Sequence, residues 1–226
     1  MSDVRAVVAQ NTVPRVKDDA FRNIRLGRGG EIVTIPWTQA LIMEGKVFGV
    51  QFGDATTDPV GAGTFGAGVV DLDEFDFLQT IPATVTVMPL YYEVSLLAIG
   101  TAGETGLHVV WGSGGVKHAS GITPVAFNMK AASSNTSLCT LSALSDDAGT
   151  AIVPAGIVCS RITTAITGAA TGMNLVPPWS ALAEGGAPML KGAASTGRQI
   201  AAFFPAIGGT GYFVSRYAEF GVDEIE

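Results

Sequence analysis

Short apolar runs that alternate with polar residues recur along most of the chain. Val85 and Val87 alternate with Thr84 and Thr86, which is the pattern of a strand with one buried face. Similar runs follow at short spacing, separated by Gly, Asn and Asp: KVFGVQF, LHVVWGSGGVKH, ITPVAFNMKAAS, TSLCTLSALS and AIVPAGIVCSRITTAI. No helical pattern alternates with them, so the spacing predicts an all-β fold, an antiparallel β-sandwich that is jelly-roll-like, rather than a parallel βαβ sheet.

One short helix and an N-terminal arm precede these strands. Pro36 is suited to begin a helix and Gly45 to follow its end, which predicts a helix over WTQALIME. Residues 1–30 are polar, basic and interrupted by glycine, with no sustained periodicity. We therefore expect an extended arm and the short helix within residues 1–45, and a β-sandwich body over residues 46–226.

The last part of the chain reads RQIAAFFPAIGGTGYFVSRYAEFGVDEIE. An apolar run, a Gly-Gly-Thr-Gly turn and an aromatic run predict a β-hairpin. We expect its final strand to lie at a sheet edge, where the acidic residues 223–226 would prevent uncontrolled pairing with other strands.

Charged residues are scarce. They make up 15% of the chain, against about 25% in typical soluble domains. Such a chain leaves broad uncharged areas on its surface, and areas of this kind usually mark partner contacts. The composition therefore predicts self-association. The apolar runs are too short to span a membrane, and the N-terminus lacks the apolar core of a signal peptide, so we expect no membrane contact and no export by the secretory route.

The basic residues gather at the N-terminus. Six of the 13 lie in the first 28 positions: Arg5, Arg15, Lys17, Arg22, Arg25 and Arg28. Three Asp residues oppose them, so this segment carries +3 and, given the total of −7, the remainder carries −10. A basic arm on an acidic body predicts contact with an acidic neighbour. Because +3 is modest, we favour a protein subunit over nucleic acid as that neighbour.

Acidic residues cluster in VVDLDEFDF, at Asp71, Asp73, Glu74 and Asp76. Their alternation with apolar residues is typical of an exposed or interfacial strand. We expect the cluster to receive the basic arm of a neighbouring copy. A structural cation held by carboxylate oxygens is the alternative, although the cluster lacks the pattern of an EF-hand loop.

Motifs that would indicate catalysis or cofactor binding are weak. Residues 61–66 match G-x-G-x-x-G, but no strand directly precedes them and no helix follows, as dinucleotide binding requires. His108 and His118 are the only histidines, too few for a zinc site. Cys139 and Cys159 lie in strand-like runs, where we expect buried free thiols. The sequence therefore predicts no enzyme activity, no catalytic residue, no cofactor and no bound metal.

Two stretches resemble a known group of proteins. RLGRGGEIVTIPWTQALIMEGKVFGVQF has the order of an arm, a short amphipathic segment and a first strand. NLVPPWSALAEGGAPMLKGAASTGRQIAAFFPAIGGTGYFVSRYAEF has a proline-containing approach, an apolar strand, a Thr-Gly turn and a terminal aromatic strand. Both orders resemble virion proteins of tailed bacteriophages, and Ile81-Pro82 before an alternating strand fits the same pattern. The resemblance covers about half of the chain and implies β-sandwich proteins that form or decorate the particle.

These observations support one hypothesis and leave two alternatives open. The hypothesis is a repeated capsid or capsid-decoration (cement) subunit, assembled in the host cytoplasm and bound in the virion to copies of itself and to other virion proteins. The first alternative is a tail, head–tail connector or receptor-binding fibre component, for which Trp111 and Trp179 are candidate sugar-binding aromatics. The second is a β-sandwich hydrolase that uses the carboxylates of the Asp71–Asp76 cluster.

Overall fold

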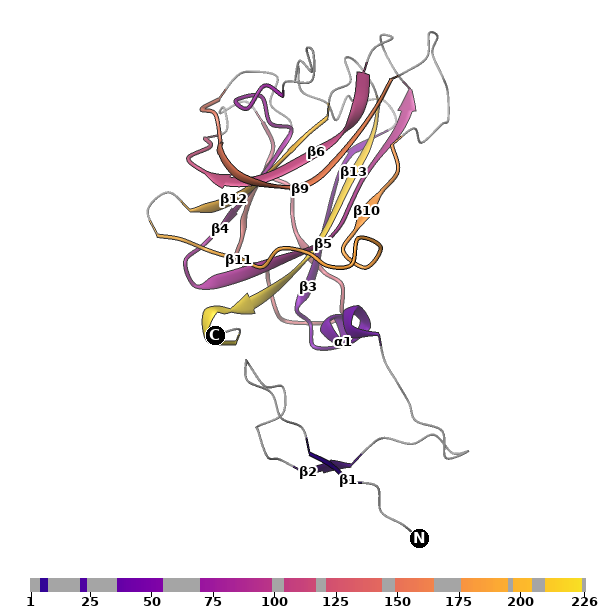
Figure 1. Ribbon diagram of the computed structural model, residues 1–226, viewed down its shortest axis with the longest axis vertical. Coiled ribbons are helices and arrows are strands. Elements are labelled where there is room, and N and C mark those ends of the chain that lie inside the picture. Colours follow the sequence, from indigo (N-terminus) through magenta and orange to yellow (C-terminus); the bar gives the residue numbers. More distant parts are fainter. Residues whose placement is uncertain are drawn as a thin grey trace.

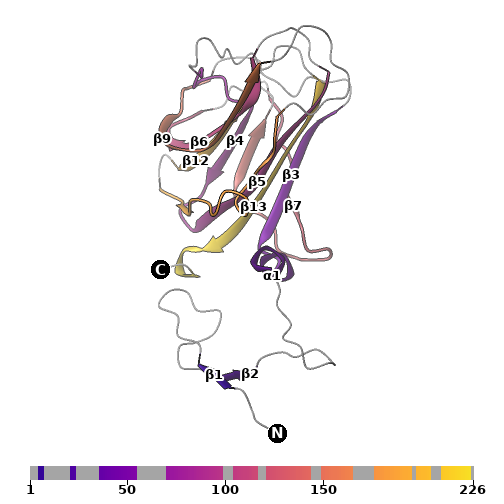
Figure 2. The same ribbon diagram turned by 45° about the vertical axis from the view of Figure 1, so that its right-hand side comes forward.

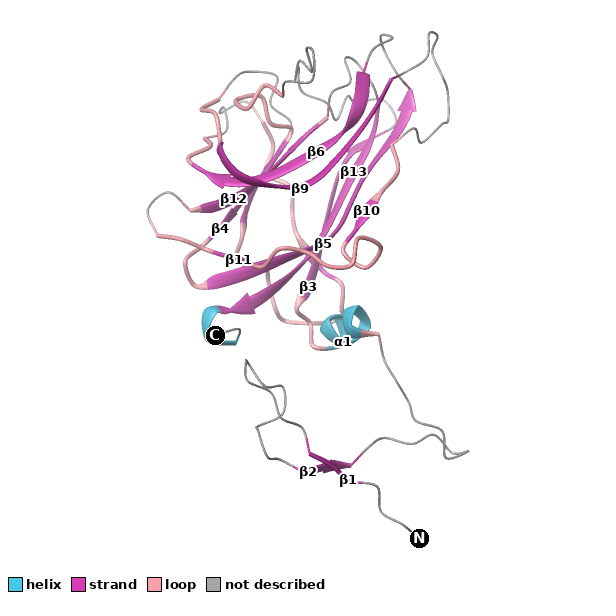
Figure 3. Ribbon diagram, viewed as in Figure 1, coloured by secondary structure: helices cyan, strands magenta, loops and turns pink. Residues whose placement is uncertain are grey.

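The computed structural model describes most of the body and two short segments of the arm. The described residues are 5–7, 21–23, 36–54, 70–98, 104–116, 121–143, 149–164, 176–194, 197–204 and 210–224. Strands dominate these residues, and the single α-helix among them lies beside the sandwich (Figures 1 and 3).

The helix α1 spans Trp37–Met43, as the sequence predicts. Pro36 stands at its N-cap, and Gly45 follows its C-terminus with a φ of 71°, a left-handed conformation that favours glycine. Leu41 is the buried residue of α1 and belongs to a cluster with Leu90 and Ala218. The helix is therefore held against the outer face of a sheet by burial of Leu41, with Ile42 packed against the same cluster.

One sheet of the sandwich follows the order β10-β5-β13-β3-β7, and β11 pairs with β5 beside β10. All of its pairings are antiparallel. Its strands are β3 (Val47–Asp54), β5 (Val85–Ala98), β7 (Phe127–Asn128), β10 (Trp179–Ser180), β11 (Leu190–Lys191) and β13 (Thr210–Gly221).

The facing sheet follows the order β8-β4-β12-β6-β9, again with antiparallel pairings. Its strands are β4 (Phe77–Ile81), β6 (Glu104–Ser113), β8 (Thr140–Ala143), β9 (Val153–Thr164) and β12 (Arg198–Phe203). Separately, β1 (Arg5–Val7) and β2 (Phe21–Asn23) form an antiparallel pair, and a 3₁₀ turn, η1, covers Val222–Glu224.

The strand order is that of a jelly roll. Four strands, β10-β5-β13-β3, face four others, β4-β12-β6-β9, and the chain passes repeatedly from one sheet to the other (Figure 2). Eight strands interleaved in this way make two Greek keys folded together. The predicted antiparallel, jelly-roll-like sandwich is therefore confirmed. Three further strands join the two sheets: β7 and β8 extend them beyond β3 and β4, and β11 pairs with β5 beside β10.

Aromatic side chains fill much of the space between the sheets. The Phe213 ring lies 4.8 Å from that of Phe204, 5.1 Å from Phe52 and 5.2 Å from Phe77, between ring centroids. These four residues come from both sheets and are buried. Their packing joins the sheets into one core, because each aromatic ring removes a large apolar area from water.

The predicted C-terminal hairpin is wrong. The two strands exist, but β12 pairs with β4 and β6 in one sheet, whereas β13 pairs with β5 and β3 in the other. β13 is consequently a central strand rather than an edge. Its residues are buried on both faces, with Phe213 and Tyr217 in the core and Ala218 in the cluster that includes Leu41 of α1.

Two other predicted strands are shorter than expected. The run ITPVAFNMKAAS contributes only β7. After β6, the Gly-rich turn leads to Val116, which makes an isolated bridge to Thr150 instead of opening a hairpin with β6. His118 lies outside the described residues.

Candidate interaction surfaces

The acidic segment does not form the predicted strand. Residues 70–76 run across the outer face of the sheet that contains β12, and their apolar residues Val70, Leu72 and Phe75 pack in one cluster with Phe203. The backbone is held by residues 149–152, because the N–H of Ile152 donates to the carbonyl of Leu72 at 3.0 Å. The segment covers a sheet rather than extending one.

Asp76 has a structural role that excludes the expected contact with a neighbouring arm. Its side chain is fully buried. Its carboxylate Oδ2 accepts the backbone N–H of Phe204 at 2.6 Å, and its own N–H donates to the carbonyl of Ala202 at 3.0 Å. The side chain therefore continues the pairing of β4 and β12 past the end of both strands, which satisfies a backbone donor that would otherwise be buried without a partner.

The other acidic residues lie nearer the surface. Asp71 is exposed and Asp73 and Glu74 are half-buried. A hydrogen bond with the Asp71 carboxyl is the main cause that raises the pKa of Asp73, with burial and charge repulsion adding to it. Among the described residues, no group of three or more His, Cys, Asp or Glu side chains is arranged to hold a metal ion. Asp71, Asp73 and Glu74 remain the members of the cluster that a neighbouring arm could reach.

Two residues of the basic arm fall within the described part of the chain. Arg5 in β1 pairs with Asn23, and Arg22 in β2 pairs with Ala6. The arm thus contains a short antiparallel pairing that its sequence pattern did not indicate. The other basic residues of the prediction, Arg15, Lys17, Arg25 and Arg28, lie outside the described residues.

The end strands of the two sheets define two opposite flanks of the sandwich. β7 and β8 end their sheets on one flank, where Ile122 also bridges to Ala143. β9 and β10 end the sheets on the other, where Arg161 of β9 forms an ion pair with Glu184, which follows β10. We call residues 121–143 the β7–β8 flank and residues 153–164 the β9 flank.

The β7–β8 flank exposes large apolar side chains. Val125 is 80% exposed and Leu138 is 60% exposed, and Ile122 and Phe127 are close to half exposed. The only charged residue in this 23-residue segment is Lys130. A hollow of about 420 Å³ opens on the flank, lined by residues 123–126 and 136–141, with the exception of Leu138. The surface is concave and nearly free of charge, and it combines exposed apolar side chains with threonine and serine.

The β9 flank is an open strand edge with the same lack of charge. Among the described strands, only β6 pairs with β9, so the other side of this 12-residue strand has no strand beside it. Val153 is 68% exposed and Ile157 is 64% exposed, with Ala155 exposed between them. Arg161 is the only charged residue of β9, and Glu184 engages it.

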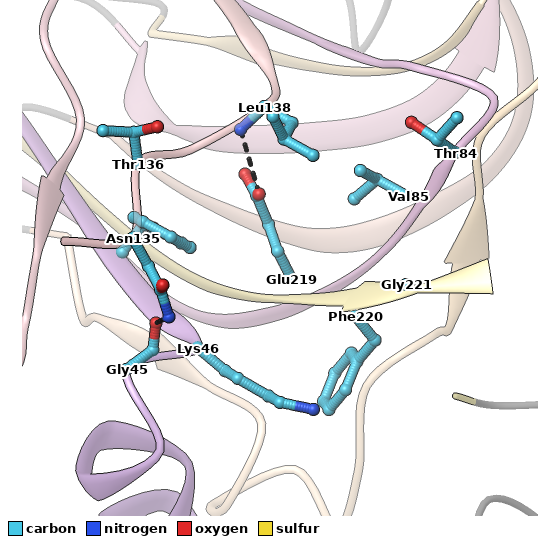
Figure 4. Close-up of a pocket in the computed structure, with 11 residues that line it drawn as sticks. Gly45, Lys46, Thr84, Val85, Asn135, Thr136, Leu138, Glu219, Phe220 and Gly221 are labelled. Atoms are coloured by element: carbon cyan, nitrogen blue, oxygen red, sulfur yellow. Dashed lines mark hydrogen bonds between the residues drawn. The ribbon is translucent and has the colours of Figure 1, made fainter. Parts of the chain in front are cut away.

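A buried carboxylate fixes the position of the β7–β8 flank. Glu219, in β13, accepts the backbone N–H of Leu138 at 3.0 Å (Figure 4). It also accepts the hydroxyl of Ser137. The same hydroxyl lies 2.9 Å from the phenol oxygen of Tyr217. Glu219 is only 9% exposed. The arrangement clamps residues 137 and 138 to the end of the central strand.

The pocket beside this clamp has a volume of about 210 Å³. Asn135 and Lys46 lie on its walls, and the Asn135 amide donates to the carbonyl of Gly45 at 3.2 Å (Figure 4). Lys46 pairs with Glu224 at 2.8 Å and lies 5.3 Å above the ring of Phe220. The side chains of Asn135 and Lys46 are thus bound to other groups of the chain. The pocket lies where the C-terminal strand contacts the loop at residues 135–138.

The remaining candidate residues have packing roles in the structure. Cys139 and Cys159 are free thiols, and burial raises the pKa of both, that of Cys159 to about 12. His108 is half-buried beside Phe203, and burial lowers its pKa. The expectation of a buried free thiol is confirmed for Cys159, whereas Cys139 is half-buried. The glycine motif at residues 61–66 lies outside the described residues.

The two candidate sugar-binding tryptophans do not share a groove. Trp179 is buried and packs against Tyr92, with 5.6 Å between ring centroids. Trp111 is half-buried, and the guanidinium of Arg198 lies 5.0 Å above its ring. Trp179 is therefore part of the core and unavailable to a ligand in solution.

Comparison with protein-family profiles, with curated proteins and with solved structures finds no match to this chain. In the described part of the chain, no helix has the length and apolar character of a membrane-spanning segment.

The flanks are the surfaces that motif-based reasoning missed. A signal was present in the sequence, because residues 121–143 and 153–164 each contain a single charged residue. What the sequence lacks is any sign that these two segments end opposite sides of the same pair of sheets.

Proposed function

We propose that this chain is a repeated structural subunit of a virus particle, a capsid or capsid-decoration (cement) subunit that binds copies of itself. One observation carries the proposal: a jelly roll with an aromatic-filled interior exposes uncharged apolar side chains on both of its flanks. Viral capsid proteins are one of the groups built on this fold, and exposed apolar patches mark association surfaces.

The packing of the core favours a role in assembly. Jelly rolls also serve as lectins and as cupins. Here Phe52, Phe77, Phe204 and Phe213 occupy the space between the sheets. The molecule therefore offers its outer surfaces to partners, and these surfaces carry little charge. Under this proposal, many copies of the chain assemble in the host cytoplasm and become part of the virion.

Each rival function loses one of the residues on which it relied, whereas Asp71, Asp73, Glu74 and Trp111 stay at least partly exposed. A hydrolase based on the acidic cluster would need accessible carboxylates, but Asp76 is buried and bound to the backbone of Phe204. A receptor-binding fibre with exposed tryptophans would need Trp179 at the surface, and this residue lies in the core. A subunit of the tail or of the head–tail connector would also associate through these surfaces. We therefore include both positions in the broader proposal of a virion structural protein.

The solution mass of the purified chain tests the proposal. We expect light scattering to find a trimer, a pentamer or a larger closed assembly that dissociates on dilution. If the basic arm contributes, deletion of residues 1–30 weakens assembly, and added salt weakens the full-length assembly more than the truncated one. The truncated body should keep its β-type circular dichroism. A monomer at every concentration and salt level would contradict a self-associating subunit.

A further inference from the structure

We propose that a hollow beside α1, on the outer face of the sheet that contains β5 and β13, binds a small amphipathic carboxylate. Such a ligand joins one carboxylate group to an apolar chain. The hollow has a volume of about 350 Å³, at the lower end of the range of about 300–1,000 Å³ for small-molecule sites. Of the residues that line it, only Met129 belongs to one of the two flanks. The site therefore goes beyond the proposed function and does not depend on it.

Most of the lining of this hollow is apolar. Six of the ten lining residues are apolar, and they come from α1, β3, β5 and the segments after β7 and β10: Ile42, Val47, Leu90, Met129, Ala181 and Leu182. Val47, Leu90 and Ala181 are buried, whereas Leu182 is 69% exposed. The lining thus extends from the interior to the surface, and a ligand that enters gains free energy by removing its apolar chain from water.

A bulge in β5 brings two consecutive residues to the hollow. Arg216 of β13 pairs with Tyr91, but the next residue, Tyr217, pairs with Pro89, so Leu90 is an extra residue in β5. Neighbouring side chains of a regular strand point to opposite faces of the sheet. Here Leu90 and Tyr91 both line the hollow, as a bulge allows. The irregular pairing therefore adds an apolar and an aromatic side chain at the same place.

Arg216 is the one charged residue in the lining. Its guanidinium carbon lies 5.1 Å from the ring centroid of Tyr91. The Tyr91 hydroxyl donates to Glu93, and this carboxylate also accepts the hydroxyl of Ser95 at 2.8 Å. In the part of the chain that the structure describes, Arg216 forms no ion pair. Stacking on a ring therefore holds the guanidinium, while its N–H groups can still bind an acceptor.

The chemistry of the lining selects the class of ligand. A guanidinium binds the two oxygens of a carboxylate through a pair of parallel hydrogen bonds. One positive charge matches a monocarboxylate, whereas a phosphate group carries about −1.5 to −2 at pH 7 and would need a second cation. The apolar lining requires a chain attached to the carboxylate. A neutral apolar molecule would leave Arg216 without an acceptor, and a short carboxylate would leave the apolar side chains in contact with water.

Three probes test the site by isothermal titration calorimetry on the full-length chain: octanoate, octan-1-ol and acetate. Octan-1-ol has the apolar chain without the charge, and acetate has the charge without the chain. We expect octanoate to bind at least tenfold more tightly than either, because only octanoate uses both the guanidinium and the apolar lining. Equal binding of octanoate and octan-1-ol would overturn the selection of a carboxylate. No binding of octanoate at millimolar concentration would overturn the site.

Three variants locate the binding. Arg216→Met keeps a long side chain and removes the charge, so we expect at least tenfold weaker binding of octanoate. Thr38→Trp enlarges a half-buried residue of α1 that lines the hollow, and it should weaken octanoate binding by filling the space. Arg198→Met is the matched control, because the Arg198 guanidinium lies 5.0 Å above the ring of Trp111 but does not line the hollow.

Thermal melts should show that all three variants fold, and Arg198→Met should bind octanoate as the unmodified chain does. Unchanged octanoate binding in Arg216→Met would overturn the assignment of Arg216. Equal losses of binding in Arg216→Met and Arg198→Met would show that octanoate responds to the charge of the whole surface, and would overturn the site as well. None of these outcomes bears on subunit association, which the solution mass of the chain tests separately.

Discussion

Glu219 of β13 accepts the backbone N–H of Leu138 at 3.0 Å, although 81 residues separate the two in the chain. This bond links the end of the central strand to the loop before β8, and Ser137 donates to the same carboxylate. The contact matters because the loop that it holds carries the exposed Leu138 and part of the hollow on the β7–β8 flank.

We predict that Glu219→Ala destabilises the protein by about 3 kcal/mol, because a buried acceptor of two hydrogen bonds is lost and its donors remain. Glu219→Gln keeps the size and one acceptor oxygen and should cost about 1 kcal/mol. Chemical denaturation measures both. The matched control is Glu224→Ala, which removes a partly exposed ion pair with Lys46 and should cost less than about 1 kcal/mol. Equal losses for Glu219→Ala and Glu224→Ala would contradict the clamp.

Phe213 is predicted to be the most sensitive position of the core. Its ring lies within about 5 Å of three other aromatic rings between the sheets, and its side chain is fully buried. Phe213→Ala should therefore cost about 4 kcal/mol in unfolding free energy. Phe127→Ala, at a side chain that is 48% exposed, should cost about 1 kcal/mol or less. A similar loss for both would mean that the aromatic cluster is not the centre of the core.

Two neighbouring glycines should respond differently to alanine. A Cβ at Gly112 would lie 2.1 Å from the carbonyl oxygen of Val153, so Gly112→Ala must displace β9 from β6. We expect a cost of about 3 kcal/mol. A Cβ at Gly114 would meet no atom within 4 Å, and its φ of +83° alone opposes the change, at about 1 kcal/mol. Thermal melts of the two variants give the comparison, and a larger loss for Gly114→Ala would refute the close approach of β9.

A pair of buried glutamines should also respond in opposite directions. Gln79 is fully buried in β4, and neither end of its amide completes a hydrogen bond, although the Cys139 thiol lies within range. Gln79→Leu should therefore be neutral or raise stability by up to about 1 kcal/mol. Gln199 donates to the carbonyl of Gly115 at 2.7 Å and accepts its N–H at 2.8 Å. Gln199→Leu leaves both groups without partners and should cost about 2 kcal/mol.

The denaturation midpoints of the two glutamine variants decide this prediction. A clear loss of stability in Gln79→Leu would show that the amide is satisfied in solution, for example by a bound water that bridges it to the protein.

His108 should make stability depend on pH near neutrality. Burial lowers its pKa in the folded protein, whereas the unfolded chain takes up a proton near the ordinary value of about 6.5. The unfolded state therefore binds more protons as the pH falls through this value, so the contribution of His108 to stability is present above about pH 6.5 and declines below it. His108→Leu should show a smaller fall in melting temperature between pH 7.5 and pH 5.5. An unchanged fall would mean that other groups cause it, since His118 is present in both proteins.

Local features were readable from the sequence where local physics decides them. Pro36 and Gly45 enclose α1, because one residue fixes a helical start and the other tolerates the left-handed conformation after the end. The strands β3, β5, β6 and β9 coincide with apolar runs, since a half-buried strand needs a period of two. The low charge also indicated uncharged surfaces before their location was known.

Pairing between strands was decided only by the tertiary structure. β12 and β13 are neighbours in sequence with a turn-like link, but each pairs with strands that lie far away in the chain. The burial of β13 agrees with these pairings: Phe213 and Tyr217 lie between the sheets and Ala218 packs in the cluster with Leu41 of α1, as suits a strand inside a sheet. The role of Asp76 depends in the same way on Phe204, which is 128 residues distant. An alternating pattern shows which side chains of a strand face the core, but it does not show which strands pair with it. Pairing is determined by packing across the whole core. The two flanks could therefore be located only in the tertiary structure.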